Sequence, residues 1–129
     1  MPGQPAVQVK GAKELRRALK HMDADVKDLR DINLAAARVV SDRADDLAPK
    51  RTGRLSRSVR ATATKSRGNV VAGSRMVPYA GPIHFGWRAR NIEPQPFLYD
   101  ALDDRREQVA DRYEAEVERL VNRLDRETP

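Results

Sequence analysis

Apolar residues recur every three or four positions over residues 12–48, a segment without glycine or proline. This spacing places the apolar side chains on one face of an α-helix. The apolar positions are Leu15, Leu19, Met22, Val26, Leu29, Ala36, Val40, Ala44 and Leu47, with Asn33 as the one polar intruder. A single helix here would be about 55 Å long, which is long for a small domain. Because Asp23 and Asp25 can cap a second helix, we expect two helices or one bent helix.

A period of two replaces the helical period after Pro49, which ends the helical segment. Apolar and polar residues alternate between Val59 and Thr64, which predicts a strand with one solvent-facing side. Residues 66–69 are a candidate hairpin turn, and residues 70–74 form the expected returning strand. The pattern therefore predicts a β-hairpin after the first helical segment.

Prolines and glycines interrupt the pattern between residues 75 and 96. We expect a loop over residues 75–78, a short or irregular strand at most over residues 79–87, and another loop over residues 88–96. From Phe97 onward the helical spacing returns and predicts a last helix, with Pro96 suited to its first turn. Its apolar stripe contains Leu98, Ala101, Leu102, Val109, Tyr113, Val117, Leu120, Val121 and Leu124.

The order of these elements predicts an α+β fold. It contains a long N-terminal helix or helix pair, a small antiparallel β-sheet built on a hairpin, a long loop, and a C-terminal helix packed on the sheet. We expect residues 1–9 to be a flexible N-terminal arm because they contain Pro2, Gly3 and Pro5. Residues 10–125 are expected to form a single domain, and residues 126–129 a C-terminal tail. No apolar run reaches the length of a membrane helix, and the first residues lack the apolar core of an export signal.

Charge is sorted along the chain. Residues 47–92 contain no acid and ten cations, which are Lys50, Arg51, Arg54, Arg57, Arg60, Lys65, Arg67, Arg75, Arg88 and Arg90. Residues 93–129 contain eleven acidic and six basic groups, whereas residues 1–46 are nearly balanced. Self-repulsion in the basic centre should destabilise an isolated subunit unless a negative partner lies opposite. Nucleic acid, an acidic protein surface and another copy of this chain are the candidate partners.

The residues that usually carry chemistry are scarce. There is no cysteine, and neither His21 nor His84 has partners at metal-ligand or catalytic spacing. We expect His21 to lie on the surface and His84 to have a structural or interface role. No phosphate-binding loop or nucleophile motif is present. We therefore expect no enzymatic activity and no catalytic, metal or cofactor-binding residues.

The two charged regions each allow two interpretations. The carboxylates of the last helix follow i,i+3 and i,i+4 spacing with arginines between them, which favours a solvated face with intrahelical ion pairs; the alternative is a docking surface for a basic neighbour. The basic centre could be a solvated sheet face or a nucleic-acid surface. Because no helix is basic on one face in the manner of a recognition helix, any DNA contact would be with the backbone and independent of sequence.

An ordered set of short motifs gives a family resemblance. Residues 48–59 read Ala-Pro-Lys-Arg-Thr-Gly-Arg-Leu-Ser-Arg-Ser-Val, residues 79–80 Tyr-Ala, residues 83–86 Ile-His-Phe-Gly, and residues 96–102 Pro-Phe-Leu-Tyr-Asp-Ala-Leu. In this order and spacing, over about residues 12–125, they resemble the tail-component family of long-tailed bacteriophages. That family includes neck, tail-completion and minor tail protein Z-like proteins.

The resemblance implies a structural virion protein of the phage head–tail junction, assembled in the host cytoplasm. It implies a homo-oligomeric ring, expected to be hexameric, around the channel through which genomic DNA passes without sequence recognition. The implied neighbours are a connector or stopper protein and a tail terminator or tail tube. The alternative is a non-specific nucleic-acid-binding protein that uses the basic segment of residues 50–90. A chaperone or toxin-like regulator has no supporting feature beyond small size.

These expectations define three sets of candidate residues. The basic side of the interface contains Arg54, Arg57, Arg60, Arg75, Arg88 and Arg90. The acidic side contains Asp103, Asp104, Glu107 and Asp111. The turn and packing anchors are Gly53, Tyr79, Phe85, Gly86, Trp87 and Phe97.

Overall fold

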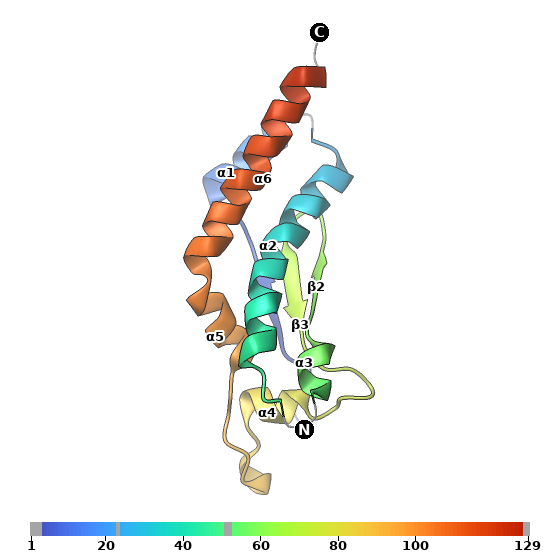
Figure 1. Ribbon diagram of the computed structural model, residues 1–129, viewed down its shortest axis with the longest axis vertical. Helices are drawn as coiled ribbons and strands as arrows, with labels where there is room; N and C mark the ends of the chain where they lie inside the picture. Colours follow the sequence, from blue (N-terminus) through green and yellow to red (C-terminus); the bar gives the residue numbers. More distant parts are fainter. Residues whose placement is uncertain (1–3, 23, 51–52, 128–129) are drawn as a thin grey trace.

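The helix α2 (Val26–Leu47) lies between a small sheet and the C-terminal helix (Figure 1). The computed structural model describes residues 4–22, 24–50 and 53–127. α2 begins with a capping box, in which the Asp28 amide donates to the Asp25 carboxylate at 2.7 Å and the Asp25 amide to the Asp28 carboxylate at 3.4 Å. A shorter helix, α1 (Lys13–His21), precedes it. The predicted helix pair is therefore confirmed, and Asp23 lies outside the described residues.

Three antiparallel strands form a sheet in the order β1–β3–β2. The central strand, β3 (Gly68–Val71), pairs with β2 (Arg60–Ala63) and with β1 (Ala6–Val9). Val7 and Val9 of β1 are buried against α2 and the rest of the core. The prediction of a flexible arm is thus wrong for residues 6–9, which are ordered by pairing with β3; residues 1–3 are outside the described range.

The predicted hairpin is present, but its turn lies two residues earlier in the chain than predicted. The turn lies at residues 64–67, where the Thr64 amide donates to the Arg67 carbonyl at 2.9 Å, and the returning strand starts at Gly68. Gly68 packs directly on α2. A Cβ at that position would lie 2.7 Å from both the Ala37 Cβ and the Asn33 carbonyl oxygen. Since real Cβ contacts are longer, the close approach of sheet and helix requires glycine here.

Residues 79–87 contain a short helix, α4 (Ala80–Phe85), instead of the predicted irregular strand. Pro82 lies in its first turn, where a missing N–H removes no helical hydrogen bond. Ala80, Gly81 and Pro82 are all buried, so small side chains let this helix pack closely. Another short helix, α3 (Arg54–Ser58), follows α2, and a 3-10 helix, η1 (Arg88–Arg90), lies within the predicted loop.

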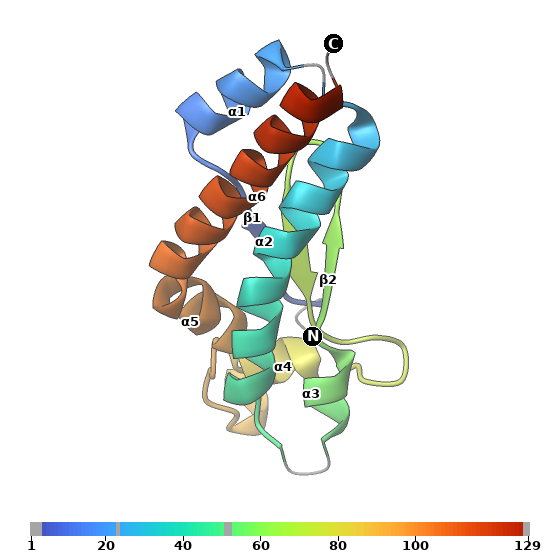
Figure 2. The same cartoon turned by 45° about the horizontal axis from the view of Figure 1, so that its top comes forward.

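The predicted last helix is divided into α5 (Phe97–Asp104) and α6 (Arg106–Glu127), with a break at Arg105. α6 runs antiparallel to α2 and beside it (Figures 1 and 2). Contact with the sheet is made by α5 on β1 and by Tyr113, whose hydroxyl lies 3.2 Å from the Val9 carbonyl oxygen. Residues 126–127, predicted as part of a tail, continue α6. The α+β class is confirmed.

The elongated molecule has two distinct ends (Figure 2). α3, α4, η1 and the loop between β3 and α4 gather at one end, near the C-terminus of α2. α1, the start of α2 and the end of α6 gather at the other. Residues of the basic centre are therefore divided between two separated regions.

Candidate interaction surfaces

The first region, which we call the basic end, carries Lys50, Arg54, Arg57, Arg60, Arg75, Arg88 and Arg90 on α3, η1 and the adjoining segments. All seven residues are exposed to solvent. The basic end contains all six arginines that were predicted from the sequence as the basic side of the interface. Arg51 is outside the described residues. The chain thus brings together six arginines that are up to 36 positions apart in the sequence, from Arg54 to Arg90.

Three arginines of the basic end also support the local fold. The Arg60 guanidinium donates to the carbonyl oxygens of Ser58 at 3.0 Å and Gly73 at 2.7 Å. The Arg90 guanidinium carbon lies 5.4 Å from the centroid of the Trp87 ring, a cation–π contact. Arg57 folds over Gly53, so that a Cβ on this glycine would lie 2.8 Å from the guanidinium. These side chains are less available to a partner than their charge suggests.

The second basic region surrounds a groove between α1 and the hairpin turn. We call it the basic groove; its volume is about 480 Å³. Its cations are Lys13, Arg16, Arg17 and Lys20 of α1 and Lys65 of the turn, and none of the described residues that line it carries a carboxylate. Between the cations lie Leu15, Leu19, Leu29, Asn33, Ser66 and Tyr113. The expectation that no helix is basic on one face is therefore wrong for α1. Its four cations follow i, i+3, i+4 and i+7 spacing, which places them on one face of the helix. The spacing was missed because only the apolar positions of this segment were considered.

The predicted acidic side is divided by the structure. Asp104 pairs with Arg43 of α2 at 2.9 Å, and Asp103 pairs with Arg106 at 2.8 Å. Both carboxylates are therefore used within the chain. Glu107 and Asp111 instead begin a longer surface, which we call the acidic stripe: Glu107, Asp111, Glu114, Glu118 and Asp125.

The members of the acidic stripe are four, three, four and seven residues apart, which places them on one face of α6. All are exposed, and within the described residues none forms an ion pair closer than 4.0 Å. Val121 is 38% exposed and lies on the same face. By contrast, Glu116 pairs with Arg112 and Arg119 along the helix. Sequence spacing could have separated these two faces of α6.

The predicted anchors occupy different environments. Phe97 is buried in the core, whereas Phe85 is 42% exposed, and Tyr79 and Trp87 are partly buried. Gly53 has a φ of 76° at the turn into α3. Gly86 has a φ of 80°, and a Cβ there would lie 2.9 Å from Pro94. Both glycines are therefore required by their backbone conformation.

His84 lies at the centre of an aromatic cluster at the basic end. Its ring centroid is 4.6 Å from those of Phe85 and Tyr99 and 5.1 Å from that of Phe97. The side chain is fully buried, and neither ring nitrogen has a hydrogen-bond partner among the described residues. Burial lowers the pKa of His84, partly opposed by the charge of Asp100. The arrangement is that of a neutral packing residue.

Within residues 4–22, 24–50 and 53–127, no group of three or more His, Asp or Glu side chains is arranged to hold a metal ion. None of the helices in the described part of the chain is long and apolar enough to cross a membrane. The chain matches no protein-family model, no curated protein and no solved structure.

Proposed function

We propose that this protein is a structural component of the head–tail junction of a long-tailed bacteriophage, where it forms a ring around the DNA channel and joins head to tail. The motif resemblance suggests this role. The observation that carries the proposal is the presence of opposite charges on two different surfaces of one small chain. The acidic stripe lies along α6, and the cations lie in the basic groove and at the basic end.

Two different complementary patches on one chain favour a head-to-tail contact between identical copies. Such heterologous contacts close into a ring when a whole number of equal rotations from one subunit to the next completes a full turn. Opposite charges across the contact would cancel the repulsion within each patch and would speed association. A sixfold ring is expected from the family resemblance.

The projecting segment around η1 is the part of the molecule best placed to contact a second component of the junction. The segment from Trp87 to Ile92 extends from the body at the basic end (Figure 1). Arg88 and Arg90 are exposed on it. In the proposed role this tip contacts the neighbouring neck or tail protein, while the helices make the contacts within the ring.

The rival function is non-specific binding of nucleic acid by the free subunit, and the basic face of α1 favours it. The two functions predict a different salt dependence of DNA binding and a different mass of the purified protein. A nucleic-acid-binding subunit should bind duplex DNA at micromolar or tighter affinity, with a steep decrease as salt increases. A neck protein should bind DNA weakly and exist as a discrete oligomer.

The test combines the mass of the purified chain with its place in the phage particle. We expect sedimentation equilibrium to give a discrete oligomer and negative-stain microscopy to show rings with an axial opening. In a phage that lacks the gene, filled heads and complete tails should accumulate unjoined. A chain that stays monomeric at high concentration and is absent from virions would exclude the proposed function.

A further inference from the structure

We propose that the acidic stripe of one copy docks in the basic groove of the next copy. This inference rests on the proposed ring function and assigns the surfaces that form its subunit contact. It differs from the pairing suggested by the sequence, in which the basic side was the segment now found at the basic end.

The basic groove has the composition of a docking site for an acidic amphipathic helix. Cations of α1 and Lys65 surround it, and the partly buried Leu15 and Leu29 contribute apolar surface between them. Within the described residues, none of its five cations forms an ion pair closer than 4.0 Å. A helix that carries carboxylates around an apolar side chain would satisfy both the charge and the apolar surface.

The second half of the acidic stripe matches this description. Glu114, Glu118 and Asp125 surround Val121 on the exposed face of α6. This part of the stripe extends over about 16 Å of helix, and the cations of α1 extend over about 10 Å. Lys65, on the opposite wall of the groove, widens the positive surface. Val121 can contact the leucines while the carboxylates meet the cations.

The basic end fits the stripe less well. Arg60 and Arg90 are engaged within the chain, as described above. The cavity beside η1 is lined by Glu93 as well as Arg88, so it is not uniformly positive. Repulsion between Glu93 and the carboxylates of α6 would oppose docking there.

Nucleic acid also fits the basic groove less well than a helix does. Proteins that hold nucleic acid without sequence preference usually stack bases on exposed aromatic rings. The one aromatic residue of the groove is Tyr113, which is only 3% exposed. The leucines would remain uncovered by a phosphate backbone.

Charge exchange between the two surfaces tests the inference. In the groove variant, Arg16, Arg17 and Lys20 are each replaced by Glu; in the stripe variant, Glu114, Glu118 and Asp125 are each replaced by Lys. The matched control replaces Lys50, Arg75 and Arg88 at the basic end by Glu, which changes the charge by the same amount as the groove variant does. All nine positions are exposed, so circular dichroism should show folded proteins.

We expect the groove variant and the stripe variant each to sediment as monomers, and the control to keep the mass of the wild-type oligomer. A chain with both reversals should assemble again, because its groove and stripe are again of opposite charge. If the control dissociates while the groove variant stays assembled, the inference is wrong and the ring function stands. If the wild type is monomeric, the ring function itself fails. If the groove variant stays assembled but loses binding to a duplex DNA probe, the groove faces nucleic acid and the inference is overturned.

Discussion

The Tyr113 hydroxyl on α6 donates a hydrogen bond to the side-chain oxygen of Asn33 on α2 at 2.7 Å. The Asn33 amide nitrogen in turn donates to the carbonyl oxygens of Thr64 and Lys65 in the hairpin turn, each at 3.1 Å. The Val9 carbonyl of β1 lies 3.2 Å from the same hydroxyl. The polar side chain of Asn33 therefore has a structural role within the apolar stripe of α2. It connects α6 to the hairpin turn of the sheet.

Replacing Tyr113 by Phe should destabilise the fold by about 1–3 kcal/mol, because Asn33 loses a buried hydrogen-bond partner. Urea unfolding followed by circular dichroism measures this change. Tyr99→Phe is the matched control. Tyr99 is 45% exposed, and its hydroxyl makes no hydrogen bond within the described residues, so the Tyr99→Phe substitution should change the free energy of unfolding by no more than about 0.5 kcal/mol. Equal effects of the two substitutions would show that the Tyr113 bond contributes nothing.

Alkaline pH should weaken the fold through the same residue. Burial raises the pKa of Tyr113 from 10.0 to about 12. Between these values the folded protein keeps a proton that the unfolded chain releases, so this contribution is complete below pH 10 and is lost as pH rises toward 12. Thermal unfolding at several pH values should show a steeper decline for wild type than for Tyr113→Phe. Parallel curves would contradict the prediction.

Mild acid should also weaken the fold, through His84. Because burial lowers the pKa of His84, the unfolded chain takes up a proton near the ordinary value of 6.5 while the folded chain does not. Stability should therefore fall as pH decreases below 6.5. His84→Leu should be within about 1.5 kcal/mol of wild type at neutral pH and should lose less stability on acidification.

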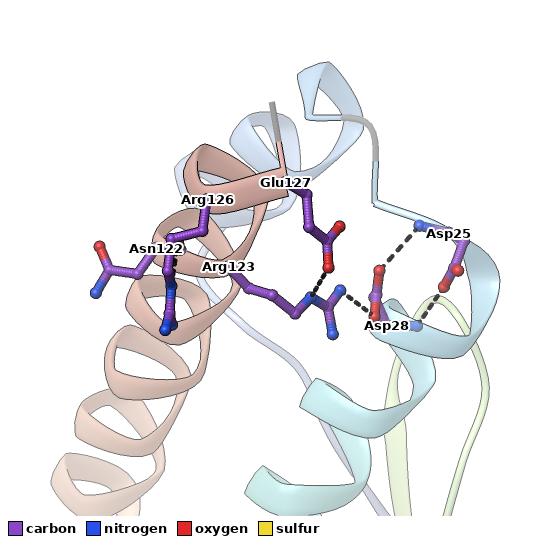
Figure 3. Close-up of polar contacts among 6 residues, drawn as sticks. All are labelled: Asp25, Asp28, Asn122, Arg123, Arg126 and Glu127. Atoms are coloured by element: carbon purple, nitrogen blue, oxygen red, sulfur yellow. Dashed lines mark hydrogen bonds and ion pairs between the residues drawn. The ribbon is translucent and has the colours of Figure 1, made fainter. Parts of the chain in front are cut away.

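Stronger acid should act at the contact between α6 and the start of α2 (Figure 3). The hydrogen bond from Arg123, 2.7 Å long, lowers the pKa of the Asp28 carboxyl below its usual 3.8. Asp28 therefore stabilises the fold above about pH 4, and this contribution is lost as pH falls through the lowered pKa. Asp28→Asn should reduce stability at pH 7 and flatten this acid dependence. Arg123→Gln leaves the capping box intact, so it should lower the free energy of unfolding less than Asp28→Asn does. Urea unfolding of both variants at neutral and acid pH measures this difference.

The tip around η1 should be dispensable for folding but required for joining. Trp87 and Ile92 are connected by two backbone hydrogen bonds, of 2.8 and 3.1 Å, that close the tip. Replacing residues 88–91 by a two-residue Asn-Gly turn keeps these bonds and removes Arg88 and Arg90. We expect a stability change below about 1 kcal/mol and a loss of head–tail joining in phage extracts. A large loss of stability would show that the tip is part of the core.

The sequence predicted the elements whose patterns are long enough to repeat. The helix pair, the cap at Asp25, the hairpin and the last helical region all follow from periodicity and capping residues. β1 was missed because four residues after Pro5 carry little pattern, and they become a strand only by pairing with β3. α4 was missed because six residues with Gly81 and Pro82 show no helical period.

The interaction surfaces were only partly predictable, because they depend on tertiary contacts. Lys65 is more than 40 residues from α1, so only the fold brings them to one groove. The pairing of Asp104 with Arg43 connects residues 61 positions apart and removes this carboxylate from the free surface. The acidic stripe, by contrast, could be read from its spacing along one helix.

The position of Gly68 has a mechanical consequence. No side chain separates β3 from α2 at this point, because the glycine lies against the Asn33 carbonyl and the Ala37 methyl group. Sliding of the strand would bring a larger side chain against the α2 backbone, and separation would leave a void in the packing, so strand and helix should move together. Any adjustment of the groove to an incoming helix must then come from α1, which is nine residues long and begins without a side-chain cap.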